Sequence, residues 1–180
     1  MQSITQEQAE AIFREYSSYV YRVALFISRS STMAEDITQE TFLQVFRKYG
    51  SYDATRPIGP WLYKITLNIT RNTLRKQKWL QLFMEIPEQK STHSIEEEVL
   101  KNQIDQELWQ EINHLTLKSR EVIVLHYYLG LKLIEIAKVL DIPLGTCKSR
   151  LHTAMNSLTK KLRANDHFIS YQGGDQHEKL

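Results

Sequence analysis

The apolar residues of this chain recur at intervals of three and four positions, which places them on one face of an α-helix rather than on alternating sides of a strand. The first such series is Ile12, Tyr16, Tyr19, Val23 and Ile27. Glycine and proline, which interrupt helices, number only 6 and 4 in 180 residues. We therefore expect an all-α fold, with room for one ordinary domain or two small ones.

Local signals predict where the helices begin and end. A second helix is expected from Thr32, whose spacing to Glu35 is that of a capping box, to about Tyr49, before Gly50. Pro60 suits the first turn of a third helix because its missing N–H has no helical partner there. Four further helices are expected at about 95–114, 117–129, 132–140 and 145–163.

The segment 84–103 is polar, acidic and interrupted by Pro87, so we interpret it as a linker between two small helical domains. The expected organisation is a first domain at 1–83, the linker, a second domain at 104–164 and a flexible tail at 165–180. In the second domain, a short helix, a tight turn and a longer basic helix form the pattern of a helix-turn-helix.

The formal net charge is only +2, but the charge is unevenly distributed. Residues 54–84 contain six basic residues and no acid, and residues 142–165 contain five basic residues and no acid. The intervening residues 85–111 contain eight acids and two bases. This pattern is expected of two modules that contact a polyanion, and ordinary solvated helix faces are the alternative interpretation.

The last expected helix has one apolar face, which is predicted to point inward and to make Cys147 a buried structural thiol. The residues of this face are Cys147, Leu151, Ala154, Leu158 and Leu162. Small and basic residues near the helix start are predicted to point outward, with Arg150 at the flank: Lys148, Ser149, His152 and Thr153. Such side chains reach base edges and phosphates in a helix-turn-helix, although a plain surface helix has a similar pattern.

In the third expected helix, polar residues at intervals of four, three and four form a stripe without acidic partners. It consists of Lys64, Asn68, Arg71 and Arg75. Three aromatic residues lie beside this stripe in the sequence: Tyr52, Trp61 and Tyr63. Proteins that bind single-stranded nucleic acid combine aromatic and cationic side chains, because the bases stack on the rings while the cations follow the backbone. Trp61 and Tyr63 could equally belong to the core of the domain.

The second expected helix has an acidic stripe with an apolar residue in it. The stripe and its flank consist of Asp36, Gln39, Glu40, Leu43 and Arg47. This combination is poorly suited to DNA and better suited to a protein partner with basic residues. A solvated helix face is the alternative interpretation.

We find no catalytic set in the sequence: no glycine-rich phosphate loop, no cluster with metal-ligand spacing and no nucleophile with a nearby base. The N-terminal residues are polar, and no apolar run approaches the length of a membrane span. We therefore expect a cytoplasmic binding protein that is not an enzyme, has no metal or cofactor and does not insert into a membrane.

Two blocks, residues 34–76 and 119–162, resemble bacterial RNA polymerase sigma factors of the extracytoplasmic-function (ECF) type, which keep only the second and fourth sigma domains. The first block reads AEDITQETFLQVFRKYGSYDATRPIGPWLYKITLNITRNTLRK, and the second reads SREVIVLHYYLGLKLIEIAKVLDIPLGTCKSRLHTAMNSLTKKL. The chain departs from the family's usual residues at Thr153, Met155 and Asn156, at Lys132-Leu133 and in the loop 57–60.

The resemblance implies a role for each stripe in promoter recognition. Core RNA polymerase would be bound by Asp36, Gln39, Glu40 and Leu43. The −10 element and its melted strand would be bound by Tyr52, Trp61, Lys64, Asn68, Arg71 and Arg75. The duplex −35 element would be read by Lys148, Ser149, Arg150 and His152. An anti-sigma partner is also implied.

Two other classes of protein share part of this pattern. A stand-alone helix-turn-helix regulator would share the C-terminal half and would not need the first block. A protein-binding helical adaptor explains the acidic stripe but leaves the two acid-free basic segments unexplained.

Overall fold

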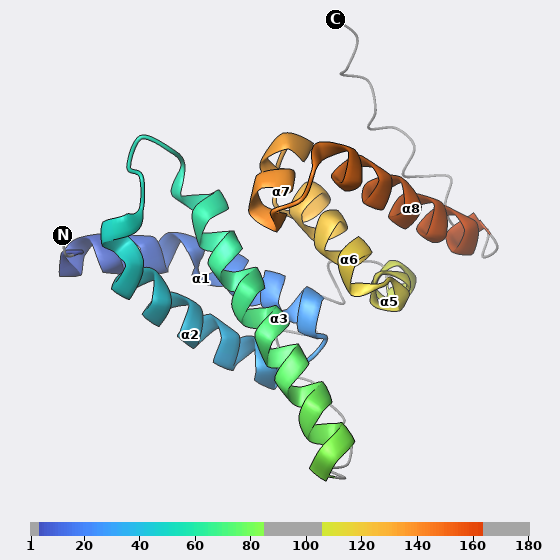
Figure 1. The fold of residues 1–180 in the computed structure, drawn as a ribbon, viewed down its shortest axis with the longest axis horizontal. Helices are drawn as coiled ribbons and strands as arrows, with labels where there is room; N and C mark the ends of the chain where they lie inside the picture. The colour runs from blue at the N-terminus through green and yellow to red at the C-terminus, as the bar shows by residue number, and fades with distance from the viewer. Residues whose placement is uncertain (1–3, 85–105, 164–180) are drawn as a thin grey trace, which may run out of the picture.

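The computed structural model describes residues 4–84 and 106–163, and within these ranges the chain forms helices and turns with no strand (Figure 1). Three long helices come first: α1 (Gln6–Ser28), α2 (Ser31–Lys48) and α3 (Ile58–Met84), with the 3-10 turn η1 (Tyr49–Ser51) after α2. The second half contains α5 (Gln106–His114), α6 (Leu117–Ile123), the π-helical turn η2 (Val124–Tyr128), α7 (Leu133–Leu140) and α8 (Leu144–Arg163). The all-α prediction is confirmed.

The start of α2 differs from the predicted one. Arg29 ends α1 in the left-handed region at φ 63°, and Ser30 is extended, so the chain turns within two residues. Ser30 is therefore the N-cap, and its hydroxyl accepts a hydrogen bond of 3.3 Å from the Met33 N–H. The predicted capping box of Thr32 and Glu35 is wrong, because Thr32 already lies inside the helix.

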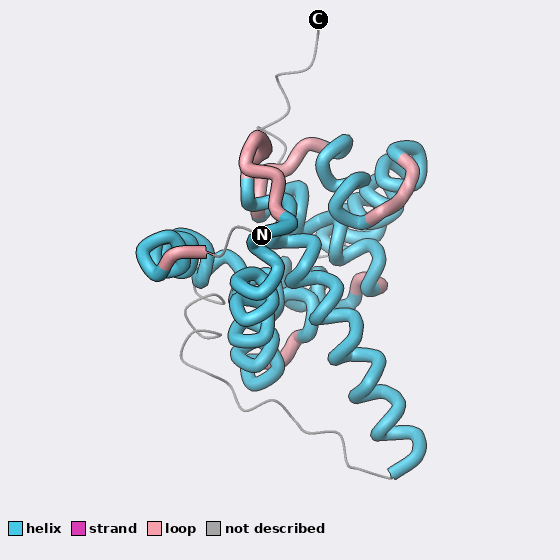
Figure 2. Tube along the Cα trace, turned by 60° about the vertical axis from the view of Figure 1, so that its left-hand side comes forward, coloured by secondary structure: helices cyan, strands magenta, loops and turns pink. Residues whose placement is uncertain are grey.

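The N-terminal unit, which we define as α1, α2 and α3, packs its three helices around a shared apolar core. Val23, Ile37 and Leu62 contribute one buried side chain from each helix. Helix α3 begins at Ile58, two residues earlier than predicted, and Pro60 still lies in its first turn. Both views show the last turns of α3 extending beyond the other helices (Figures 1 and 2).

The C-terminal unit, which we define as α5 to α8, contains the predicted helix-turn-helix as α7, a turn and α8. Asp141 ends α7 in the left-handed region at φ 56°, and its N–H donates to the carbonyl of Ala137. The predicted helix at 95–114 is described only from Gln106 onward. Apart from Met84, the predicted linker lies outside the described residues, as does the predicted tail at 165–180.

The two units pack against each other and share one apolar cluster. The Phe26 ring of α1 lies between Trp109 of α5 and Tyr128 of η2, with ring centroids 5.0 and 5.3 Å away. Helix α3 also contacts α7, and α1 contacts α6. We call this packed state the closed arrangement, and it brings surfaces that are far apart in the sequence next to each other (Figure 2).

Candidate functional site

The acidic stripe of α2 lies on the exposed side of the N-terminal unit, as its spacing predicts. Asp36 and Gln39 are exposed, and Glu40 is partly buried and accepts a hydrogen bond from the Gln44 amide at 3.1 Å. Leu43 leaves 50% of its surface exposed, whereas Ile37 on the other side of α2 is buried. The arrangement leaves carboxylates around an uncovered apolar side chain, which suits a protein surface with basic residues.

The polar stripe of α3 is only partly free. Lys64, Asn68 and Arg75 are exposed. Arg71 instead forms a bidentate ion pair with Glu121 of α6, with Nε to Oε1 at 2.6 Å and Nη2 to Oε2 at 2.7 Å. The Glu121 side chain is 2% exposed and that of Arg71 is 27% exposed. The hydrogen bonds to this carboxylate raise the pKa of Arg71.

The prediction that this stripe has no acidic partner is therefore wrong. The local sequence around Arg71 contains no acid, and Glu121 lies 50 positions further along the chain in the other unit. Helical spacing rules relate residues three or four apart, so they contain no information about such a pair.

The aromatic residues near the start of α3 have different environments. Tyr63 is buried in the core of the N-terminal unit, which confirms the structural alternative for that residue. Trp61 is partly buried, and its ring lies 5.2 Å from that of Tyr52, centroid to centroid. The Tyr52 hydroxyl donates to the carbonyl of Arg56, which fixes the preceding loop against this ring pair. Tyr52 and Trp61 are thus the aromatic pair beside the cationic stripe.

The start of α8 presents the predicted polar side chains to solvent. Lys148, Ser149 and His152 are exposed, and Arg150 is partly buried. The Asn156 side chain lies 3.0 Å from Nε2 of His152, so a residue that departs from the family pattern contacts a predicted DNA-reading residue. The predicted −35 side chains therefore share one end of one helix.

The inward face of α8 is confirmed by the burial of Cys147, Ala154 and Leu158. Burial raises the pKa of the Cys147 thiol, which makes it a poor nucleophile at neutral pH. Leu151 is partly buried, and the side chain of Leu162 lies outside the described ones. The cysteine is thus part of the packing.

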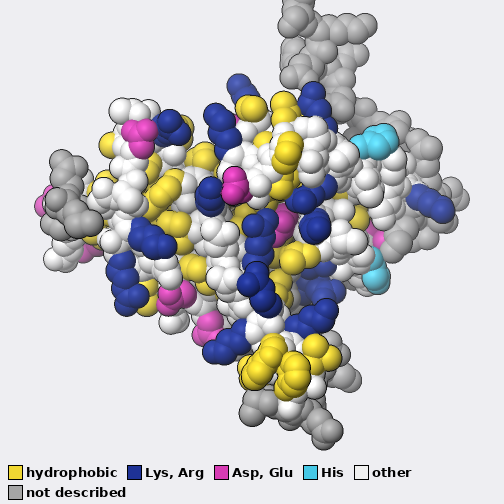
Figure 3. Space-filling view, viewed as in Figure 1, with side chains coloured by type: hydrophobic (Ala, Val, Ile, Leu, Met, Phe, Trp, Pro, Cys, Tyr) yellow, Lys and Arg dark blue, Asp and Glu magenta, His cyan; other side chains and the backbone are white. Residues whose placement is uncertain are grey.

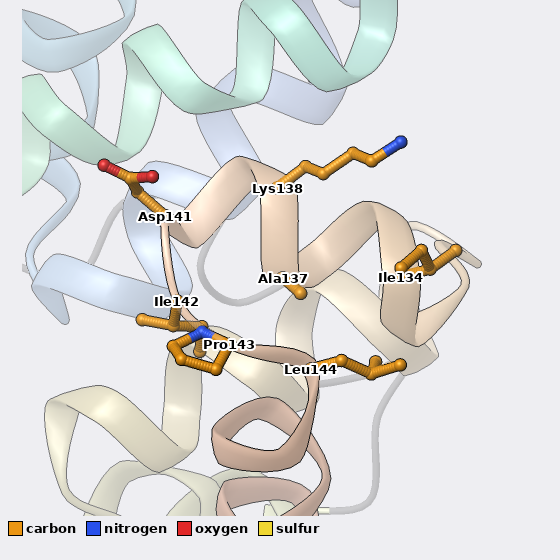
Figure 4. Close-up of a pocket in the computed structure, with 7 residues that line it drawn as sticks. All are labelled: Ile134, Ala137, Lys138, Asp141, Ile142, Pro143 and Leu144. Atoms are coloured by element: carbon orange, nitrogen blue, oxygen red, sulfur yellow. The ribbon is translucent and has the colours of Figure 1, made fainter.

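A small hollow of about 410 Å³ lies between α7 and the start of α8 (Figure 4). Its lining is mostly apolar and includes Ile134, Ile142 and Leu144, while Lys138 and Asp141 point away from each other. It contains no histidine, cysteine or serine that could act as a base or a nucleophile. Among the described residues we also find no group of three histidine, cysteine or acidic side chains arranged to hold a metal.

A second groove, of about 480 Å³, lies between the two units and contains residues from two of the predicted DNA-binding sets. Arg71 and Arg75 of α3 line one side of it, and Arg150 of α8 lines the other. The closed arrangement therefore brings together residues predicted for the −10 and −35 elements.

Sequence reasoning missed several residues at this junction. Glu121 and Arg120 are both buried, although a charged pair in a helix is normally expected at the surface. The Arg120 guanidinium donates to the carbonyls of Ile27, Asn113 and Leu115, at 3.0, 3.2 and 2.8 Å. Burial lowers the pKa of Arg120 to about 10, which leaves it protonated at neutral pH. The available signal in the sequence was that both directly precede the apolar run 122–125.

Comparison with known families places these features in one class. The family of sigma-70 region 2 matches residues 12–80, and that of sigma-70, region 4 matches residues 105–158. The two matches cover the N-terminal and C-terminal units in that order. The fold and its helix-turn-helix therefore define a sigma-70-type protein with regions 2 and 4, which bind core RNA polymerase and promoter DNA.

Similar proteins narrow this class further. The chain is 33% identical over 159 residues to ECF RNA polymerase sigma factor SigW of Bacillus subtilis, covering 82% of this chain and 85% of SigW. It is 28% identical to ECF RNA polymerase sigma factor SigL of Mycobacterium tuberculosis, covering 85% and 88% of the two chains. The chain belongs to the ECF RNA polymerase sigma factor family. It directs RNA polymerase to promoters, and a stand-alone helix-turn-helix regulator is not favoured.

Solved structures share the fold at lower identity. The sigma factor RpoE of Bartonella quintana, in complex with the anti-sigma factor NepR, matches with a TM-score of 0.70 at 22% identity, over 87% of this chain and 97% of that one. CnrH, in complex with the cytosolic domain of CnrY, matches with a TM-score of 0.68 at 22% identity, over 89% and 91%. None of the described helices is long and apolar enough to span a bilayer.

Proposed function

We propose that the chain starts transcription through three separate surfaces and performs no catalysis itself. The acidic stripe of α2, Asp36, Gln39, Glu40 and Leu43, binds core polymerase. The −10 surface consists of Tyr52, Trp61, Lys64, Asn68, Arg71 and Arg75. The −35 surface consists of Lys148, Ser149, Arg150 and His152. The observation that carries this proposal is the exposed cationic stripe of α3, which begins beside the Tyr52–Trp61 ring pair.

This ring pair and stripe favour a melted strand over a duplex. Unstacked bases can stack on Tyr52 and Trp61 while the cations of α3 follow the phosphates. A duplex offers its bases only at the groove edges, so it gains the phosphate contacts without the stacking. The difference in binding free energy between the two states favours strand opening.

The closed arrangement is incompatible with both promoter contacts at once. Elements named −10 and −35 are about 25 base pairs apart, or about 85 Å at 3.4 Å per step. Arg71, Arg75 and Arg150 line a single groove of about 480 Å³. The two units must therefore separate before the −10 and −35 surfaces can be occupied together, and the Arg71–Glu121 ion pair must break.

Further expectations follow from the family. We propose that residues 1–83 and 104–164 act as the two binding modules, joined by 84–103, and that the protein works in the cytoplasm. The solved relatives RpoE and CnrH are in complexes, the first with an anti-sigma factor. We extend this to the present chain and expect an anti-sigma partner for it as well.

Run-off transcription with core polymerase on candidate promoters tests the proposal. The wild-type chain is expected to confer initiation, and the double variant Asp36→Lys/Glu40→Lys to reduce it at least about tenfold by placing cations against basic partner residues. The matched control is Glu7→Lys/Glu10→Lys, which makes the same charge change on exposed positions of α1. Equal losses in both variants would rule out a dedicated stripe, and operator binding without initiation would rule out the function.

The salt dependence of promoter binding tests the α3 stripe separately. Arg75→Ala in the holoenzyme is expected to weaken promoter binding and to reduce the slope of log K against log salt by about one unit, since one phosphate contact is lost. Filter binding or fluorescence anisotropy at several salt concentrations measures this slope. A slope equal to that of the wild type would exclude a phosphate contact at Arg75.

A further inference from the structure

The groove between the two units has a charge that its neighbours do not balance. Among the described residues, those that line it include five cationic side chains and one acid: Arg71, Arg75, Lys78, Lys118, Arg150 and Glu121. These residues come from α3, α6 and α8, so both units contribute cations. Figure 3 shows lysine and arginine side chains gathered along the middle of one face of the molecule, with acidic side chains among them.

The acid among these described lining residues is already neutralised. Both carboxylate oxygens of Glu121 accept hydrogen bonds from the Arg71 guanidinium, at 2.6 and 2.7 Å. Among the described side chains, no carboxylate lies within ion-pair distance of Arg75, Lys78 or Lys118. Arg75, Lys78 and Lys118 thus line the same groove without a described acidic partner, and a cleft lined by one sign of charge focuses its field on an incoming anion.

The size of the groove limits what can enter it. A volume of about 480 Å³ lies within the range of small-ligand sites. Guanidinium groups match the oxygens of phosphate with paired hydrogen bonds, and ammonium groups bind phosphate as point charges. A small anion with several phosphates fits this combination of volume and charge.

We propose that this groove binds a small polyphosphate anion, either inorganic or carried by a nucleotide, and that the anion holds the two units together. The full set of cations is present only while the two units are packed together, because no single unit supplies all of them. A ligand that binds only the closed arrangement must stabilise it by mass action. The regulatory consequence, fewer molecules able to occupy both promoter elements, rests on the function proposed above.

The binding step is tested with the full-length chain alone. Calorimetry with inorganic tripolyphosphate at constant ionic strength is expected to give saturable 1:1 binding. Lys118→Ala and Lys78→Ala, which leave every predicted DNA-binding residue in place, are each expected to weaken this binding at least fivefold. The matched control is Lys48→Ala, an exposed lysine of α2 that lies away from the groove, and it is expected to leave binding unchanged.

A second arm separates the sources of the anion. ATP binding as tightly as tripolyphosphate indicates recognition of the phosphates alone, and tighter ATP binding indicates that the nucleoside also contributes. Any of three results overturns the proposal. The first is that tripolyphosphate shows no saturable binding, and the second is that Lys48→Ala and Lys118→Ala weaken its binding equally. The third is that Lys78→Ala and Lys118→Ala weaken the binding of a short single-stranded oligonucleotide more than they weaken the binding of tripolyphosphate. Because neither polymerase nor promoter is present, these results are independent of the initiation assay.

Discussion

Glu121→Gln is expected to increase the affinity of the holoenzyme for a promoter that carries both elements by about 10- to 100-fold, because it removes the charged partner of Arg71 and so destabilises the closed arrangement, in which the two DNA-binding surfaces cannot be occupied together. Hydrogen bonds to charged groups contribute about 1.5–3 kcal/mol each, and this pair is bidentate with a Glu121 side chain that is 2% exposed. Once the two units have separated, Glu121 is solvated, so Glu121→Gln changes the free energy of the separated arrangement little.

Two measurements check this expectation together. Small-angle X-ray scattering should report a larger radius for Glu121→Gln than for the wild type, and a titration of promoter DNA with holoenzyme should report the lower Kd. Glu35→Gln neutralises an exposed carboxylate of α2 and serves as the control. An unchanged radius combined with an unchanged Kd would show that the ion pair does not hold the units together.

Arg120→Ala is expected to destabilise the fold by about 3–5 kcal/mol, which corresponds to a loss of roughly 6–20 °C in Tm for a chain of this size. Arg120 is 4% exposed, and its guanidinium donates to three carbonyls, of which that of Ile27 belongs to the N-terminal unit. Its removal leaves buried carbonyls without donors and opens a cavity between the units.

Arg29→Ala is the matched control for this prediction. Arg29 also donates to the carbonyl of Asn113, at 3.3 Å, but its side chain is exposed and makes this single bond at the unit boundary. We expect a cost below about 1 kcal/mol for it, in line with an exposed interaction. Equal Tm values for the two variants, measured by calorimetry, would contradict a central role for Arg120.

The helices and their inward faces could be predicted because they depend on residues that are close together in the sequence. The spacing of Cys147, Ala154 and Leu158 predicted the buried side of α8, and all three are buried. The N-cap of α2 was predicted two residues too late, at Thr32 instead of Ser30, because Ser30, Ser31 and Thr32 are all acceptable N-caps. The left-handed conformation of Arg29 decides among them, and this conformation depends on how α1 packs against α2.

The junction between the units could not be predicted, because its contacts join residues far apart in the sequence. Arg71 lies on the predicted stripe at the predicted spacing, and nothing within a helical turn of it indicates that Glu121 binds it. The same holds for Arg120 and Ile27, which are 93 positions apart. Periodicity describes one helix at a time and says nothing about which faces of two helical units meet.

Because of the ring cluster around Phe26, separation of the two units is expected to change the heat capacity of the protein. Phe26 and Trp109 are 2% and 5% exposed in the closed arrangement, so opening transfers aromatic surface into water. Hydration of apolar surface increases heat capacity, whereas the new contact with promoter DNA decreases it. The heat-capacity change of promoter binding therefore combines two opposing contributions, and it is less negative than the area of the DNA contact alone implies.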